Sequence, residues 1–172
     1  RQMLREMRSA FAVIFGMFVS MLIVMMGLDI YVMCQNVNIE NKADTKFAYM
    51  YTYKYPIEKV PEGGEEAFGK TLKKERLGYN LDVTLLGIHD DNPYFDAKVE
   101  DGKNKIVIST AVAQKYNVGE GDVFVLNDEE TDTKYAFDIV DIAQYSSSLY
   151  IFMDIDSMRE LFHEGSDYYN IV

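Results

Sequence analysis

The sequence is poor in the residues from which most active sites are built. Its 172 residues include one cysteine, Cys34, and two histidines, His89 and His163. A single cysteine can form neither an intramolecular disulfide nor a cysteine-rich zinc site, so Cys34 is interpreted as a small apolar residue. There is no G-x-S-x-G motif, P-loop or dinucleotide fingerprint. We therefore expect no catalytic, cofactor or metal site in this chain.

Positive charge is also scarce beyond the first few residues. The net charge is −11, and residues 1–8 carry three arginines and one glutamate, which leaves −13 on residues 9–172. Without a basic patch, the chain is not expected to bind nucleic acid or anionic lipid head groups. The acidic excess suits a soluble extracellular surface, a cationic ligand, or both.

One long apolar run indicates a membrane protein. Residues 10–28 contain no charge, and Ser20 is their only polar side chain. As a helix, this run spans roughly 28 Å, close to the hydrocarbon thickness of a bilayer. Arginines precede it and Asp29 follows it. Basic residues mark the cytoplasmic flank. We therefore expect the protein in the cell membrane, with the lipid bilayer around the helix and everything after about Asp29 outside the cytoplasm.

Two other interpretations of this run fit the sequence less well. A cleaved signal peptide usually has a shorter apolar stretch that ends in small residues, whereas here L-D-I-Y-V-M-C-Q-N follows. A buried core helix would show an amphipathic stripe, but this run is apolar on every face. A lipid-exposed transmembrane helix fits the pattern better than either.

Small residues recur at a regular spacing in the same helix. Ala12, Gly16 and Ser20 recur every four positions and so lie on one helical face. Such a face lets a neighbouring helix approach closely, and we predict that it packs against another membrane helix. The alternative is an unpatterned composition, because membrane helices are generally rich in small residues.

The chain is expected to be α+β, with a long transmembrane helix followed by a mixed sheet with short helices. Residues 1–43 are interpreted as a cytoplasmic lead-in, the transmembrane helix and a stalk, in one helix from Gln2 to about Ala43. Residues 44–172 are interpreted as an extracytoplasmic domain. The sequence begins with Arg rather than Met and ends in Y-Y-N-I-V, so it reads as a segment of a longer membrane protein.

Periodicity and turn signals predict the elements of the outer domain. Strands are expected at 47–55, 81–88, 105–109, 123–126, 135–143, 149–154 and 167–172, and short helices at 67–77, 110–116 and 155–162. The tyrosines at 49, 51, 53 and 55 would share one face of the first strand. That face is either a half-buried sheet surface with its hydroxyl groups in water or a ligand platform.

Two acidic clusters could be mistaken for functional sites. The loop His89–Asn92 has too few oxygen ligands and the wrong spacing for a calcium loop, so a polar turn stopped by Pro93 is expected. The cluster of Asp128, Glu129, Glu130 and Asp132 is interpreted as a charged hairpin tip rather than as an acid pair for glycoside chemistry.

One segment resembles a known family. Residues 105–126 read K-I-V-I-S-T-A-V-A-Q-K-Y-N-V-G-E-G-D-V-F-V-L, and Y-A-F-D-I-V-D-I-A follows. This resembles the extracytoplasmic domain of FtsX/MacB-like ABC transporter permeases, in which a strand ending in Ser precedes a helix and a Gly-Asp turn into the next strand. The residues that stand in those places are Ser109, Ala113, Lys115, Gly121 and Asp122. In the turn, Gly119 and Gly121 permit positive φ, and Asp122 can hydrogen-bond local amides.

The resemblance covers most of residues 9–172, but its motifs are structural rather than catalytic. It implies a non-catalytic permease segment that works with a separate ABC-type ATPase subunit and with the remaining permease transmembrane helices. The outer domain would transmit ATP-driven motion or recognise a substrate, a cationic peptide or a cell-envelope protein. The chain departs from the family at Asp141, where Gly is common, and it has one membrane helix where these permeases have at least four.

Two rival functions remain open. A single-pass membrane sensor or adhesion module would bind an extracellular ligand without any transporter. A membrane-anchored hydrolase would need carboxylates converging on one cleft.

Overall fold

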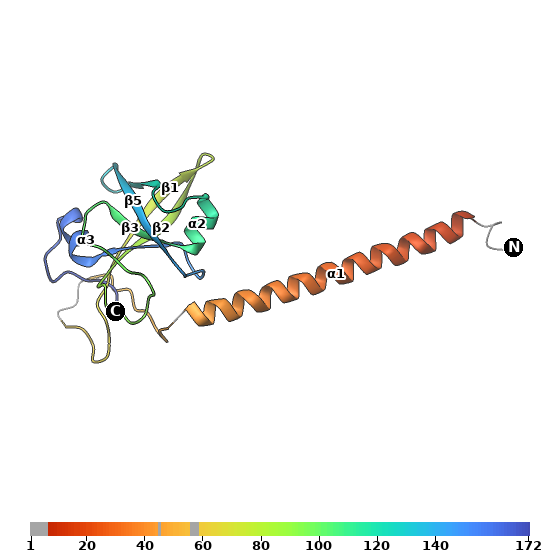
Figure 1. The fold of residues 1–172 in the computed structure, drawn as a ribbon, viewed down its shortest axis with the longest axis horizontal. Helices are drawn as coiled ribbons and strands as arrows, with labels where there is room; N and C mark the ends of the chain where they lie inside the picture. The colour runs from red at the N-terminus through yellow and green to blue at the C-terminus, as the bar shows by residue number, and fades with distance from the viewer. Residues whose placement is uncertain (1–6, 45, 56–58) are drawn as a thin grey trace. The chain divides into compact units, whose positions relative to one another are not determined.

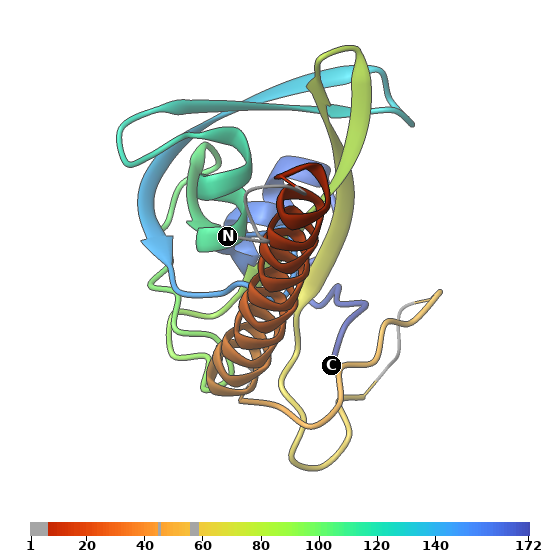
Figure 2. The same cartoon turned by 90° about the vertical axis from the view of Figure 1, so that its right-hand side faces the viewer.

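The computed structural model describes residues 7–44, 46–55 and 59–172. The chain divides into two compact units, Arg1–Glu40 and Asn41–Val172. The first unit is helical, and the described strands all belong to the second (Figure 1, Figure 2).

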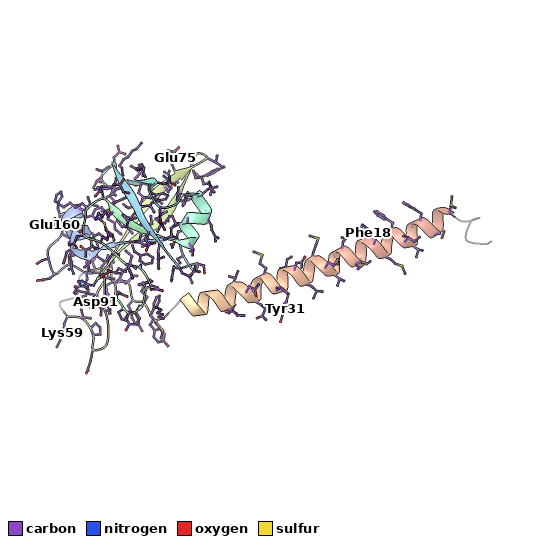
Figure 3. All side chains as sticks on the ribbon, in the orientation of Figure 1. Phe18, Tyr31, Lys59, Glu75, Asp91 and Glu160 are labelled. Atoms are coloured by element: carbon purple, nitrogen blue, oxygen red, sulfur yellow. The ribbon has the colours of Figure 1, made fainter. Side chains whose placement is uncertain are left out.

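A single helix, α1 (Met7–Asp44), makes up the described part of the first unit and continues four residues past Glu40. Ser9–Ile39 within it is long and apolar enough to cross a membrane, with a mean hydropathy of 2.5. Its side chains stand away from the helix on all sides, as Phe18 and Tyr31 do in Figure 3. A helix with apolar side chains all around suits a lipid environment. The predicted beginning at Gln2 lies outside the described residues.

The described part of the second unit contains a six-stranded closed barrel and, after the end of α1, two short helices. Its strands are β1 (Phe68–Arg76), β2 (Tyr79–Ile88), β3 (Lys105–Ser109), β4 (Val123–Asp128), β5 (Thr133–Ala143) and β6 (Tyr150–Asp154). They follow the order β1-β2-β6-β3-β5-β4. The β2–β6 and β3–β5 pairs are parallel and the others antiparallel. The expected mixed sheet of an α+β domain is confirmed, whereas its closure into a barrel was not predicted.

Apolar side chains fill the barrel and also cover part of its outside. Leu72, Leu85, Ile108, Phe124 and Ile151 belong to the inner cluster. Because alternate residues of a strand point to opposite faces, their neighbours Leu86, Val107 and Phe152 face outward, and they are nonetheless fully buried. Residues 95–99, from the loop between β2 and β3, help to cover them. Strands β2, β3 and β6 are thus buried on both faces.

The two helices connect strands and pack against the barrel. Helix α2 (Thr110–Tyr116) follows β3 and contacts β3, β5 and β6, and α3 (Ile155–Phe162) follows β6 and contacts β1, β2 and β6. The Ser109 side chain caps α2 by accepting a hydrogen bond from the Val112 amide, and Asp154 caps α3 through the Ser157 amide. Such caps satisfy amides that have no partner within the helix. These helices, the strands β2 to β6 and the β4–β5 hairpin confirm their predictions.

The helix predicted at 67–77 is wrong, because this segment is strand β1. Phe68 and Leu72 are buried four residues apart, a spacing that also occurs on a helix. In the strand, the two lysines at 70 and 74 share their face, and each ammonium lies over an aromatic ring, Phe162 for one and Phe124 for the other. A strand is identified by apolar and polar residues at alternate positions. Here lysines occupy two of the inward positions, so that alternation is absent from the sequence.

The strands predicted at 47–55 and 167–172 are also wrong as regular strands. Only isolated bridges join Thr52 and Ala67 to Ile171. The two segments do run antiparallel, with hydrogen bonds from the Tyr51 amide to the Val172 carbonyl (2.9 Å) and from Val172 back to Tyr51 (3.0 Å). Tyr49 and Tyr51 are 76% and 57% exposed, so the first segment does not present a half-buried sheet face.

The turn before β4 uses one glycine in the left-handed region. Gly121 has φ +83, whereas Gly119 is not among the described residues with positive φ. The Asp122 carboxylate accepts a hydrogen bond from the Gly119 amide at 2.8 Å. The Gly121 amide donates to the Ile139 carbonyl at 2.8 Å, which ties the turn to β5.

Replacing this glycine should destabilise the barrel. Gly121→Val should lower the free energy of unfolding by about 1–3 kcal/mol, because a β-branched residue avoids the left-handed region. Gly119→Val is the matched control, since its φ is not positive and a Cβ there meets open space. Urea denaturation followed by circular dichroism measures both variants in detergent micelles. Equal losses in the two variants would contradict the role assigned to Gly121.

Candidate functional site

A groove with a cavity of about 410 Å³ opens on the barrel unit. We call it the aromatic groove. Four segments of the chain supply its walls, namely residues 47–53, 61–67, 92–95 and 171–172. Its aromatic lining residues are Phe47, Tyr49, Tyr51, Tyr53, Tyr94 and Phe95. Phe95 and Ile171 also belong to the cluster that covers the outside of the barrel, so the groove borders that cluster.

The wall formed by residues 47–53 is fixed through the segment 170–172. The Tyr53 amide donates to the Asn170 carbonyl at 2.7 Å. The Asn170 side chain accepts from the Gly69 amide at 2.7 Å and donates to the Gly69 carbonyl at 2.8 Å. A double amide contact of this kind positions the wall against the first residues of β1.

The opposite wall is set by a local turn and by ring packing. The Asn92 carboxamide oxygen accepts hydrogen bonds from the amides of Tyr94 (2.9 Å) and Phe95 (3.3 Å), an arrangement typical of an asparagine turn. Phe47 packs against both rings, with centroid distances of 6.4 Å to Tyr94 and 5.4 Å to Phe95. The Phe95 ring rests on Phe152 of β6 at 5.1 Å, so this wall is anchored to the barrel.

The charge of the aromatic groove has one sign. Glu62 and Glu65 are among its lining residues, and the lining residues include no lysine, arginine or histidine. Neither glutamate forms a salt bridge with any described residue. The exposed rings of Tyr49 and Tyr51 stack with centroids 6.2 Å apart and planes at 27°. The groove therefore combines aromatic faces with carboxylates that can accept a cation.

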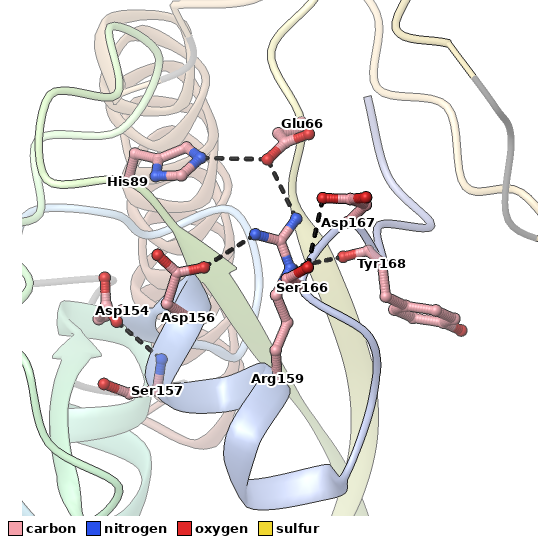
Figure 4. Close-up of polar contacts among 9 residues, drawn as sticks. All are labelled: Glu66, His89, Asp154, Asp156, Ser157, Arg159, Ser166, Asp167 and Tyr168. Atoms are coloured by element: carbon pink, nitrogen blue, oxygen red, sulfur yellow. Dashed lines mark hydrogen bonds and ion pairs between the residues drawn. The ribbon is translucent and has the colours of Figure 1, made fainter.

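A charged network next to this loop region is centred on a buried arginine. Arg159 of α3 is only 4% exposed. Its guanidinium contacts Glu66 and Asp156, each at 3.0 Å, and donates to the Tyr168 carbonyl at 2.8 Å (Figure 4). The same Glu66 oxygen lies 3.2 Å from the His89 ring. The network therefore fastens α3 to the segment before β1.

A second buried charge lies where the barrel closes. Strands β1 and β4 are joined by a single residue pair, Lys73 and Asn127. Beside it, Lys70 lies 2.9 Å from Asp128, which is only 2% exposed. Burial opposes ionisation of Asp128, but hydrogen bonds from Lys70 and from the Glu130 amide outweigh it and hold the pKa of Asp128 below its usual 3.8. Asp128 is thus a structural partner of β1, not an exposed member of the hairpin tip.

The structure places the predicted site residues in separate regions. Ala12, Gly16 and Ser20 lie on α1, where the Ser20 hydroxyl donates to the Gly16 carbonyl at 2.8 Å. Gly119, Gly121 and Asp122 form the turn before β4. The space beside Gly16 is open, and packing of that face against another helix stays a prediction. Among the described residues, no group of three acidic, histidine or cysteine side chains is arranged to hold a metal ion.

The aromatic groove was not located by sequence reasoning. The regular spacing of the tyrosines did signal a possible ligand platform, but their partners lie far along the chain. The carboxylates Glu62 and Glu65 give no signal of their own in the sequence, where they stand beside Gly63 and Gly64.

Comparisons with known proteins complete this description. Neither protein-family models nor curated protein sequences match the chain. Among solved structures, it is similar to the extracellular domain of the noncanonic ABC-type transporter YknZ from Gram-positive bacteria, with 17% identity and a TM-score of 0.44. The match covers 62% of this chain and 60% of that one, so the chain spans less than two thirds of that structure. At this identity and TM-score, no residue role, ligand or activity is transferred from it.

The pairing of Lys70 with Asp128 predicts a pH-dependent stability. Asp128→Asn should lower the free energy of unfolding at pH 7 by about 1–3 kcal/mol, because the Lys70 ammonium loses its buried charged partner. The folded-state pKa is depressed, so the contribution of the carboxylate is present above its unfolded value and is lost as pH falls through the folded value. The deficit of the variant should therefore shrink as the pH is lowered below 3.8.

Denaturant titrations at several pH values measure this deficit. Glu130→Gln is the control, because its side chain is 85% exposed and lies 3.9 Å from Lys70. It should change stability by less than about 1 kcal/mol. A deficit for Asp128→Asn that is independent of pH would show that the carboxylate charge is not what stabilises the closure.

Proposed function

We propose that the chain is a transmembrane helix and the extracytoplasmic domain of an FtsX/MacB-like ABC transporter permease. The observation that carries this proposal is the unit from β3 to β4. The residues on which the family resemblance rests have structural roles there: Ser109 caps α2, and Gly121 and Asp122 shape the turn into β4. The long apolar helix α1 before the barrel unit gives independent support.

The path of the chain through the barrel unit is also compatible with this role. Residues 51–53 and 170–172 run antiparallel and are hydrogen-bonded to each other. This pairing fixes the segment that follows α1 in the sequence to the barrel unit, as a domain that transmits motion from a membrane helix requires.

In such a machine, a separate ABC-type ATPase subunit would hydrolyse ATP in the cytoplasm and move the permease helices. The barrel unit would transmit that motion or recognise a substrate, a peptide or a cell-envelope protein, without catalysing a reaction itself. The second candidate is a single-pass sensor or adhesion module. The aromatic groove favours it, because a ligand site needs no transporter.

The orientation of the chain is testable because Cys34 is its only cysteine. In a Cys34→Ser background, a membrane-impermeant maleimide added to intact cells should label Glu130→Cys. It should label Met7→Cys only after the membrane is permeabilised, because the basic flank stays inside. Labelling of Met7→Cys alone in intact cells would reverse the proposed orientation. A mature protein whose mass lacks the residues before Leu28 would show a cleaved leader instead.

If α1 transmits motion to the barrel unit, a change in α1 should abolish transport without abolishing ATP hydrolysis. A flexible Gly-Ser stretch inserted between Asn38 and Lys42, within α1, should leave ATP hydrolysis by the full transporter nearly unchanged and abolish its transport output, because a flexible segment transmits no displacement. A helix-forming insert of the same length, based on Glu, Ala and Lys, is the control and should retain more output. Full output with the flexible insert would favour the tethered binding module.

A further inference from the structure

We propose that the aromatic groove binds a small organic cation, an ammonium group carried on an apolar body. This inference concerns the groove alone and stands whether or not the chain belongs to a transporter. Its volume of about 410 Å³ lies in the usual range for small-molecule sites. Its lining is mainly aromatic and apolar with a few polar groups, as such sites usually are.

The aromatic part of the site remains open to solvent. The rings of Tyr49 and Tyr51 are 76% and 57% exposed and form one stacked surface. Neighbouring exposed rings are unusual on a surface that contacts only water. Behind them the groove is lined by Phe95 and Ile171, which are buried among the outer core residues. The apolar body of a ligand would rest on this aromatic floor and wall.

Charge complementarity decides the sign of the ligand. Two carboxylates, Glu62 and Glu65, line the groove, and no cationic side chain lines it. Residues 9–172 together carry −13, so the surrounding field attracts cations and repels anions. A neutral apolar ligand would gain no electrostatic attraction from these carboxylates, whereas an ammonium group would be attracted by both.

Tyrosine rings add a further attraction for an ammonium group. The electron-rich face of an aromatic ring attracts ammonium groups within about 6 Å of its centroid. The barrel unit already makes this contact with its own lysines: the ammonium nitrogen of Lys54 lies 5.8 Å from the Tyr55 ring, and that of Lys74 lies 4.4 Å from the Phe124 ring. The rings lining the groove receive no such contact from described residues, so a ligand would supply it.

The test uses benzyltriethylammonium as the probe. The 1–172 chain is placed in lipid nanodiscs, and binding is followed by ligand-observed saturation-transfer NMR, with empty discs as background. Benzyl alcohol and benzenesulfonate are the neutral and anionic counterparts with the same ring. We expect the cation to bind about tenfold more tightly than the alcohol and the sulfonate not to bind, since the groove holds two carboxylates.

Paired substitutions locate the site. Glu62→Gln with Glu65→Gln should weaken binding of the cation by about tenfold at low salt, and Tyr49→Leu with Tyr51→Leu by about fivefold. The matched controls carry the same changes on exposed positions outside the groove: Glu75→Gln with Glu120→Gln, and Tyr79→Leu. These should bind the cation as the unaltered chain does. Circular dichroism verifies that each variant remains folded.

Three results would overturn the proposal. The first is equal binding of the alcohol and the cation. The second is an equal loss of binding in the groove variants and in their controls. The third is a basic hexapeptide that binds at least about tenfold more tightly than the probe and depends on the same two glutamates, because the ligand would then be a peptide rather than a small molecule.

Discussion

Burial of three strands on both faces is the constraint on which the rest of this structure depends. Strands β2, β3 and β6 place one set of apolar side chains inside the barrel and a second set outside it. Each large side chain hidden from water contributes about 1.5–3 kcal/mol, so the outer set needs a cover as much as the inner set does. Loop residues 95–99 and the segment ending at Ile171 supply that cover. The aromatic groove lies beside these covering segments and shares residues such as Phe95 and Ile171 with them. The segments that bury the outer apolar side chains therefore also form the groove.

The elements from β3 to α3 could be predicted from sequence because their signals are local. A hydroxyl cap at Ser109, a capping carboxylate at Asp154 and a glycine turn at 121 each act within a few residues. Strand β1 escaped prediction because Lys70 and Lys74 occupy inward positions, and only rings and a carboxylate from distant segments make those positions acceptable.

Closure of the barrel and formation of the groove depend on contacts between residues far apart in the chain. Nothing near Tyr51 reveals that its amide pairs with Val172, or that Asn170 binds the backbone of Gly69. A period-two pattern of tyrosines was read as a regular strand, but only short bridges form because few partners are available. The carboxylates of the groove are likewise unremarkable until these pairings bring the rings beside them.

The contact between β1 and β4 has the fewest backbone pairs of any neighbouring strands in the barrel. Neighbouring strands elsewhere are held by two or more backbone pairs, whereas here one pair is supplemented by lysine contacts to Asp128, to the Val125 carbonyl (2.9 Å) and to Glu129 (3.9 Å). Dissolved ions screen attraction between exposed charges and leave backbone ladders nearly untouched. The barrel wall therefore has one line, between β1 and β4, whose strength depends more on side-chain contacts, and so more on ionic strength, than that of the strand pairs held by long backbone ladders.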